Sequence, residues 1–383
     1  MKIDLLITEL ETGGAERCCA ELAIYLERRG HRVRVVSIGP APEGDAKETL
    51  VKKVRHAGIQ IEFLNASNPS QLWGASRNLS RLIRKDRPDI AQTFLWHANV
   101  LGAWCYSRLQ IPIVTGERVV DPRGWRNWLT RKSSQWVSRV VCVSDEVAAW
   151  CNQTVGIDRE KLLVIPNGIA IPKESELDLS LHATNAKVKE SRTHSDSEPT
   201  ATETEPILLF VGRLEVQKGI DVLLRQADSL LSSLPSHRLV LLGDGRWMDA
   251  WREWIAKSPN SHRVSLLGKR KDVRDWMLRS ELLLLPARYE GMPNVVLEAM
   301  AVGRPVAVTQ VEGIKSLLGD SLQEQSVPAG DWEGWKRLVI RLAQDPALRN
   351  RLGSANRERV KVSFRLEDQL SKYEGLYSEV LNY

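Results

Sequence analysis

The sequence predicts an α/β protein with two doubly wound domains, each built on a parallel sheet. The chain has 383 residues, which is more than one hydrophobic core usually serves. Short apolar runs without polar alternation are separated by longer amphipathic segments, a pattern typical of parallel strands buried on both faces. One polar stretch, residues 173–205, divides this pattern into two halves.

In the first half, seven apolar runs are predicted as strands with helices between them. The run after Met1 contains Asp4 and is not followed by a small-residue cleavage site, so a first strand is favoured over a signal peptide. A helix is expected over residues 17–29. The predicted strands are Ile3–Ile7, Val33–Ile38, Ile59–Leu64, Ile90–Thr93, Ile111–Thr115, Val140–Val143 and Leu162–Ile165.

The second half repeats the pattern with five predicted strands and a helical tail from Asp345 onward. Its densest apolar run ends at Pro286, and the chain has no stretch of eighteen apolar residues, which excludes a membrane-spanning helix. The predicted strands are Ile207–Val211, Leu239–Leu242, Val264–Leu267, Leu282–Leu285 and Pro305–Val308.

The stretch between the halves is predicted to be a flexible polar linker or insertion. It is rich in Ser, Thr, Glu and Lys and has no aromatic residue, so it cannot bury enough apolar surface to offset the entropy lost on ordering. The expected division is therefore a first domain over residues 1–172, the linker over 173–205, a second domain over 206–365 and a last segment over 366–383.

Composition and charge narrow the class of protein. Apolar residues make up 43% and charged residues 27%, as in soluble globular proteins. Residues 1–172 carry 24 Lys and Arg against 18 Asp and Glu, and the whole chain has a net charge of +6. This balance favours an anionic substrate or membrane surface over a nucleic-acid groove. The five cysteines form no C-x-x-C pair, which favours a reducing, cytoplasmic compartment.

The most informative motif spans residues 286–306. It begins at the end of a predicted strand, breaks at Glu290-Gly291 and restarts as a helix near Pro293, where backbone amides can bind an anion. Glu290 and Glu298 bracket this helix start. Because carboxylates repel phosphate, they are expected to accept hydrogen bonds from hydroxyl groups. A ligand with a diphosphate and sugar hydroxyls accounts for both features; an ordinary strand–turn–helix with a capping acid is the alternative.

Two further loops carry groups suited to phosphate. Arg213 and Lys218 lie in a glycine-bounded loop after a predicted strand, where a guanidinium and an ammonium can bind phosphate oxygens. The alternative is a solvated loop with two surface cations. Gly13 and Gly14 follow the first strand and allow close backbone approach at a helix start, although the spacing fits neither G-x-G-x-x-G nor the P-loop.

Together these motifs resemble those of the family-4 retaining glycosyltransferases of the GT-B fold. The resemblance covers most of the chain and implies two Rossmann-like domains whose parallel sheets face a cleft, with the acceptor on the first domain and the donor on the second. It also implies that the last helix, residues 366–383, crosses back to the first domain. The ordered motifs are GGAE, Val143-Ser144, IPNGI at Ile165–Ile169, GRL-x-x-x-KG, LGDG, and E-x7-E with EAM-x-x-G-x-PV.

The resemblance also implies roles for single residues. Glu290 would lie by the donor sugar and Glu298 would bind the nucleotide ribose, while Arg213 and Lys218 would bind the diphosphate. His97 matches a position that contacts donor sugar or acceptor. The remaining donor-binding residues implied are Gly13, Gly14, Gly291, Met292, Asn294 and Val295.

One segment departs from the family pattern. Where relatives often have a Gly-Gly turn followed by an acid, this chain has Val311-Glu312-Gly313-Ile314-Lys315. The shape of the nucleotide and sugar rim is therefore expected to differ there.

The function expected from these features is a hexosyltransferase-type retaining enzyme that moves a sugar from a nucleotide diphosphate sugar to a glycan or lipid-linked acceptor. No D-x-D pair occurs in the chain, so neither a metal nor another cofactor is expected, and the cations and helix dipole would stabilise the leaving diphosphate. The alternatives are a same-fold nucleotide-sugar epimerase or phosphorylase, and a non-catalytic basic protein that binds membranes or nucleic acid.

A basic, tryptophan-rich stretch over residues 123–139 bears on location. Trp125, Trp128, Leu129 and Trp136 recur at near-helical spacing with cations between them. One interpretation is an exposed face on an anionic membrane, which would place a cytoplasmic enzyme on the inner surface of that membrane. The other is a core-facing helix with arginines that extend to the surface. No nucleic-acid partner is expected.

Overall fold

A computed structural model describes residues 1–11, 13–44, 48–172 and 205–382. The chain forms two compact units, one of Met1–Gly168 with Leu366–Tyr383 and the other of Ile169–Arg365. The expected linker over residues 173–205 lies outside the described residues except for Glu205.

The first unit is built on a seven-stranded sheet in which every pair of neighbouring strands is parallel. The strands are β1 (Lys2–Ile7), β2 (Arg32–Ser37), β3 (Gln60–Phe63), β4 (Ile90–Phe94), β5 (Ile113–Glu117), β6 (Arg139–Cys142) and β7 (Leu162–Val164). Their order across the sheet is β3-β2-β1-β4-β5-β6-β7, so the chain reverses its direction of winding after β3. The central strands are buried on both faces, as their uninterrupted apolar sequences require.

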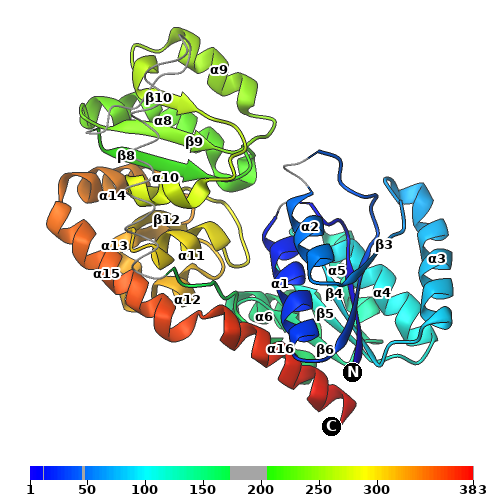
Figure 1. The fold of residues 1–383 in the computed structure, drawn as a ribbon. Helices are drawn as coiled ribbons and strands as arrows, with labels where there is room; N and C mark the ends of the chain where they lie inside the picture. Colours follow the sequence, from blue (N-terminus) through cyan, green and yellow to red (C-terminus); the bar gives the residue numbers. More distant parts are fainter. Residues whose placement is uncertain (12, 45–47, 173–204, 383) are drawn as a thin grey trace. The chain divides into compact units, whose positions relative to one another are not determined.

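Helices connect these strands and cover the sheet (Figure 1). They are α1 (Gly14–Arg28), α2 (Thr49–His56), α3 (Leu72–Lys85), α4 (Trp96–Arg108), α5 (Gly124–Ser134) and α6 (Asp145–Trp150). Ser144, of the predicted Val143-Ser144 element, caps α6 by accepting a hydrogen bond from the backbone amide of Val147 at 3.3 Å.

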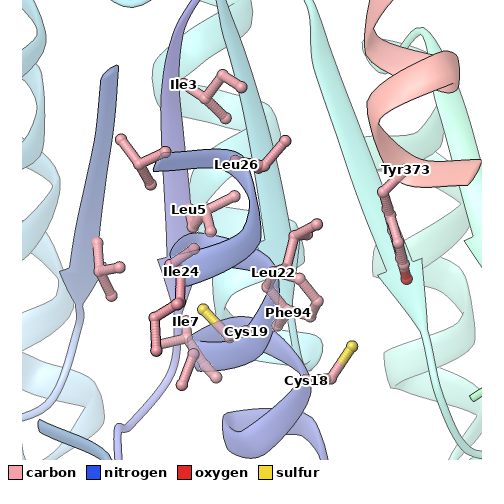
Figure 2. Packing of buried hydrophobic residues seen from close by; sticks show 14 of the residues in the cluster. Ile3, Leu5, Ile7, Cys18, Cys19, Leu22, Ile24, Leu26, Phe94 and Tyr373 are labelled. Carbon is pink, nitrogen blue, oxygen red and sulfur yellow. The ribbon is translucent and has the colours of Figure 1, made fainter. Parts of the chain in front are cut away.

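The last helix, α16 (Leu366–Leu381), belongs to the first unit although it ends the chain. Its Leu370, Tyr373, Leu376 and Tyr377 are buried in the same apolar core as β1 and α1. Figure 2 shows Tyr373 reaching toward this core beside Cys18. Glu374 adds polar contacts at the edge, accepting from Tyr25 at 3.0 Å and lying 2.8 Å from His31. The expected return of the last helix to the first domain is confirmed.

The second unit holds a six-stranded sheet, again with parallel pairing throughout. Its strands are β8 (Ile207–Val211), β9 (Arg238–Leu242), β10 (Val264–Leu266), β11 (Ser280–Leu285), β12 (Val306–Gln310) and β13 (Ser326–Pro328). The order is β10-β9-β8-β11-β12-β13, with the change of winding direction between β8 and β11. Ligands of open parallel sheets bind outside the carboxyl ends of strands at such a switch point.

The second unit contains the helices α8 (Ile220–Ser233), α9 (Met248–Lys257), α10 (Val273–Arg279), α11 (Asn294–Ala301), α12 (Ile314–Leu318), α13 (Leu322–Gln325), α14 (Trp332–Gln344) and α15 (Pro346–Ser363). The last two, α14 and α15, are long and follow each other near the end of the chain. The expected helical tail is thus confirmed. Asp345 begins α15 by accepting from the amide of Leu348, and Pro346 follows in the first turn.

The predicted fold class of two doubly wound parallel-sheet domains is confirmed, and all twelve predicted strands are present. Three details differ. Strand β13 was not predicted, α1 begins at Gly14 rather than residue 17, and Pro293 precedes α11 instead of lying in its first turn. All five cysteines are buried and free. No helix in the described part of the chain is long and apolar enough to cross a membrane.

Candidate functional site

In the second unit, four loops that follow neighbouring strands gather at the carboxyl edge of the sheet. They connect β8 to α8, β9 to α9, β11 to α11 and β12 to α12. Backbone hydrogen bonds join the first two, because Leu214 donates to Asp244 at 2.9 Å and Trp247 donates to Leu214 at 3.1 Å. The predicted GRL and LGDG motifs therefore form one joined surface.

The predicted residues Lys218 and Glu290 meet at this edge. Their ammonium and carboxylate groups are in ion-pair contact, with only 16% and 10% of the side chains exposed. Lys218 ends a short 3-10 turn and Glu290 lies in the loop after β11. The structure thus brings together a cation and a carboxylate that the sequence assigned to different parts of one ligand.

Close packing of two loops makes this contact possible. Gly219 has φ +71°, and a Cβ there would lie 1.6 Å from the carbonyl oxygen of Pro286. Only glycine fits this backbone approach, which sets the loop after β8 directly against the loop after β11. Arg288 continues the connection by donating to the carbonyl of Val216 at 2.6 Å.

Arg288 also forms a bidentate pair with Asp221, at 2.6 and 2.7 Å. Burial of Asp221 opposes its ionisation, but the hydrogen bonds and charge of Arg288, aided by Arg225, lower the pKa of Asp221 below its usual value. Asp221 is in the first turn of α8, so the pair fixes the loop after β11 to the start of that helix. Neither Asp221 nor Arg288 was predicted to have this positioning role.

The segment that departs from the family pattern supports the same loop. A carboxylate oxygen of Glu312 accepts a hydrogen bond from the backbone amide of Glu290 at 3.0 Å. Gly313, with φ +77°, lies so close to Gly291 that a Cβ would come within 2.5 Å of its carbonyl oxygen. Glu312 therefore orients Glu290 through its backbone, and it places an additional carboxylate beside the predicted sugar-binding residue.

Helix α11 begins next to this loop. Asn294 is its first residue and Val295 its second, and Met292 is buried immediately before Pro293. The amide end of the helix carries a partial positive charge, which favours an anion there. Glu298 lies one turn further along α11 and is half-buried.

Arg213 is the exposed cation of the site. Its guanidinium donates to the Gln217 side chain at 2.9 Å, and Gln217 in turn donates to the carbonyl of Tyr289 at 3.2 Å. The predicted donor-side residues Arg213, Lys218, Glu290, Gly291, Met292, Asn294, Val295 and Glu298 all lie on these connected loops or on the helix that follows them.

In the first unit, the predicted residues Gly13, Gly14 and His97 also lie at the carboxyl edge of their sheet. Gly13 precedes α1 and Gly14 is its first residue, while His97 is the second residue of α4. The loops after β1 and β4 approach each other where the amide of Ala98 donates to Thr8 at 3.4 Å. Burial, with the charges of Arg126 and Arg123, lowers the pKa of His97 below its usual value.

A buried carboxyl group that was not predicted lies at the same edge of the sheet. Glu117 ends β5, is 7% exposed and accepts a hydrogen bond from the amide of Asn99 at 3.0 Å. Burial raises the pKa of Glu117 to about 7, the Asn99 hydrogen bond opposes this rise and the charge of Asp121 adds to it. A lone Glu after a predicted strand gives no indication of burial, so this residue could not be singled out from the sequence.

The tryptophan-rich stretch forms α5 and the turn after it. Trp125, Trp128 and Trp136 are 58%, 60% and 48% exposed. The interpretation of this stretch as a core-facing helix is therefore wrong. Arg126 is mostly buried instead, 3.1 Å from Asp121 and stacked over Trp96.

Metal-ligating side chains are dispersed over the residues that the structure describes. In that part of the chain, no group of three or more His, Cys, Asp or Glu side chains could hold an ion. The predicted cations of the site, Arg213 and Lys218, both lie in the loop that connects β8 to α8.

Two family models match the chain. One, described as glycosyl transferases group 1, matches residues 191–359, and the other, glycosyltransferase family 4, matches residues 12–171. Together they span all the predicted site residues and every described strand except β1.

Two relatives that match most of the chain each share less than a quarter of the aligned residues with it. A UDP-Gal:alpha-D-GlcNAc-diphosphoundecaprenol alpha-1,3-galactosyltransferase of Escherichia coli is 23% identical over 79% of each chain. A glycogen synthase of Mycobacterium tuberculosis is 24% identical over 92% of this chain and 87% of its own.

Among solved structures, Anabaena HepE in complex with UDP-glucose has a TM-score of 0.81 at 19% identity, covering 99% of this chain and all of its own. WaaG, a glycosyltransferase involved in lipopolysaccharide biosynthesis, has a TM-score of 0.73 at 18% identity over 99% of each chain. Both share the GT-B fold with this chain.

Proposed function

The chain belongs to the group 1 glycosyltransferases of family 4, and from that premise we propose that it transfers a sugar from a nucleotide diphosphate donor with retention of the anomeric configuration. Membership of this family favours a transferase over the alternatives of an epimerase, a phosphorylase or a non-catalytic binding protein. The observation that carries the proposal is the contact of Lys218 with Glu290 beside the amide end of α11.

The diphosphate is proposed to bind at the start of α11 with Arg213 and Lys218. As the bond from the sugar C1 to the phosphate oxygen breaks, negative charge builds on the diphosphate. Fixed cations and backbone amides stabilise that charge in the transition state without reorganising. A new bond forms between C1 and the acceptor hydroxyl oxygen on the same face of the ring, and the hydroxyl proton is released.

The two glutamates are proposed to recognise hydroxyl groups of the donor. Glu290, oriented by Glu312 and Lys218, accepts hydrogen bonds from the sugar, and Glu298 accepts them from the ribose. Gly13, Gly14 and His97 belong to the other unit, where they would contact the donor or acceptor.

No metal is proposed to take part. The whole sequence contains no D-x-D pair, and two cations already lie in the loops that would bind the diphosphate. Activity should therefore persist in EDTA without added Mn²⁺ or Mg²⁺. Loss of activity in EDTA with recovery on adding Mn²⁺ would overturn the metal-free mechanism.

The donor is proposed to be a UDP-sugar and the acceptor a lipid-linked glycan, with the enzyme acting at the inner face of a membrane. HepE binds UDP-glucose, and the Escherichia coli relative uses UDP-Gal and a diphosphoundecaprenol acceptor. Five buried free thiols are compatible with a reducing compartment.

The test needs no acceptor. The purified protein is incubated with α-linked UDP-glucose, UDP-galactose and UDP-N-acetylglucosamine, and proton NMR follows the first sugar released by hydrolysis. Retention predicts that the α-anomer appears before mutarotation mixes the two forms. Initial release of the β-anomer would contradict retention. Release of sugar from a Lys218→Ala/Glu290→Gln variant at the same rate as from the parent protein would show that these residues are not the site.

A further inference from the structure

Four exposed tryptophans line one apolar groove in the first unit. Trp73, Trp104, Trp128 and Trp136 are 64%, 37%, 60% and 48% exposed and come from α3, α4, α5 and the turn after α5. With Leu72, Val100, Leu101 and Leu129 they surround a groove of about 550 Å³, here called the tryptophan groove. The rings of Trp104 and Trp136 pack edge to face with centroids 6.0 Å apart, so the groove is one continuous surface.

A second cavity of about 640 Å³ adjoins the first and shares Trp73, Ser76 and Trp104 with it. Its walls carry four arginines, Arg77, Arg81, Arg84 and Arg108; this is the arginine pocket. Among the residues that the structure describes, none of the four is within ion-pair distance of a carboxylate. Arg77 stacks over Trp73 at 5.1 Å and Arg108 over Trp104 at 3.8 Å, which joins the cationic and aromatic groups.

Helical spacing explains why these side chains share one face. Positions 73, 77, 81 and 84 of α3 follow each other at three- or four-residue steps, as do positions 100, 104 and 108 of α4. Helix α4 packs against both α3 and α5, so their stripes adjoin. Trp73 and Trp104 lie outside the tryptophan-rich stretch of residues 123–139 and join it only through the packing of these helices.

We propose that this face docks on an anionic phospholipid bilayer, with the tryptophan groove at headgroup depth and the arginine pocket on lipid phosphates. Indole rings favour the membrane interface because one part is apolar and the N–H can hydrogen-bond. One guanidinium group can donate two parallel hydrogen bonds to phosphate oxygens. The four arginines of the arginine pocket form no ion pair with a carboxylate among the described residues, so their charge remains available. This combination matches a bilayer surface, where apolar and anionic layers lie next to each other.

The inference extends the proposed lipid-linked acceptor by naming the surface that would hold the enzyme near it, and it is tested separately from catalysis. Vesicles of phosphatidylcholine, alone or mixed with phosphatidylglycerol, are sedimented with the full chain in the absence of donor and acceptor. The protein should sediment with the mixed vesicles, and the bound fraction should fall as salt rises. Binding by a catalytically inactive protein would still support this inference while removing the proposed function.

Two variants locate the surface. Arg77→Gln/Arg81→Gln/Arg84→Gln should weaken partition about 100-fold, since each basic residue near an anionic leaflet contributes to binding. The matched control, Lys52→Gln/Lys53→Gln/Arg55→Gln, removes the same charge from exposed positions of α2. It should bind the mixed vesicles much more strongly than the α3 variant does. Trp73→Ala/Trp128→Ala should reduce binding even at low salt, where electrostatic attraction is strongest.

Thermal unfolding of each variant should remain close to that of the parent protein, because the altered side chains are exposed. Equal loss in the α3 and α2 variants, equal sedimentation with neutral and mixed vesicles, or no sedimentation at low salt would overturn the proposal. Tight binding of single-stranded RNA or of a soluble protein by this face, without vesicle binding, would do so as well.

Discussion

The ammonium group of Lys218 is in ion-pair contact with the carboxylate of Glu290, although the two residues come from loops after different strands. The contact is largely enclosed, since 16% and 10% of the side chains are exposed. Removing one charge would leave the other poorly solvated and without its partner. The pair therefore contributes to local structure and, under the proposed function, to donor binding.

Lys218→Ala should lower kcat/KM by the equivalent of about 2–4 kcal/mol, because a cation beside the leaving diphosphate is lost. It should also destabilise the second unit by about 2 kcal/mol, because the Glu290 carboxylate loses its charged partner. Urea unfolding and steady-state kinetics measure the two effects. In Lys218→Ala/Glu290→Gln, stability should partly recover while activity does not. Recovery of both would assign the pair a purely structural role.

Arg213→Ala is expected to reduce kcat/KM by a similar amount, about 2–4 kcal/mol, with little change in stability because the side chain is exposed. Arg246→Ala is the matched control. Arg246 is an exposed arginine in the adjacent loop, paired with Glu215 at 3.1 Å, and it is not among the predicted site residues. Similar kinetic losses in both variants would indicate a general effect of surface charge.

Glu298→Gln should weaken binding of free UDP by about 2 kcal/mol, because a hydrogen bond between a carboxylate and the ribose is lost. Glu290→Gln should leave UDP affinity nearly unchanged and reduce turnover, since its proposed partner is the sugar. Isothermal titration calorimetry with UDP and steady-state kinetics separate the two. Unchanged UDP affinity in Glu298→Gln would contradict its assignment to the ribose.

Much of the fold could be predicted because the strands are buried on both faces and therefore appear as uninterrupted apolar runs. Strand β13, with only three residues at the edge of its sheet, lacks such a run. The predicted start of α1 is three residues late, because the Gly13-Gly14 pair indicates a turn and not the first turn of a helix.

The site could be predicted as a set of loops, since motifs after strands locate the carboxyl edge of each sheet. Its contacts could not. The close approach of Gly219 to Pro286 and the hydrogen bond from the Glu290 amide to Glu312 depend on how separate loops pack. The tryptophan groove follows the same rule, because Trp73 and Trp104 join it only through the packing of α3 on α4.

Tyr377→Ala should destabilise the first unit by about 3–5 kcal/mol, since it removes a fully buried aromatic ring from the core shared with β1 and α1. Tyr377→Phe should cost about 1 kcal/mol, because only the 3.3 Å hydrogen bond to Gln92 is lost. Glu379→Ala, an exposed change on the same helix, is the control. Hydrogen exchange should show faster opening of β1 and β4 but not of β8. Equal effects on β8 would contradict the assignment of α16 to the first unit.

Glu117 predicts a specific dependence of stability on pH. Burial raises the pKa of Glu117 from its ordinary value of 4.5 to about 7 in the folded protein. Between pH 4.5 and pH 7, the folded state therefore keeps a proton that the unfolded state has already released. The state with more bound protons loses stability as pH rises, and the loss is complete above about pH 7. Its size is on the order of 3 kcal/mol.

Glu117→Gln stays neutral and can still accept the hydrogen bond from Asn99. The variant should therefore gain stability over the parent from pH 4.5 to 7 and keep that gain at higher pH, as measured by urea unfolding across the range. Glu160→Gln, an exposed change in the same unit, should show no comparable gain. A difference between parent and Glu117→Gln that is constant with pH would mean that Glu117 is already ionised at pH 5.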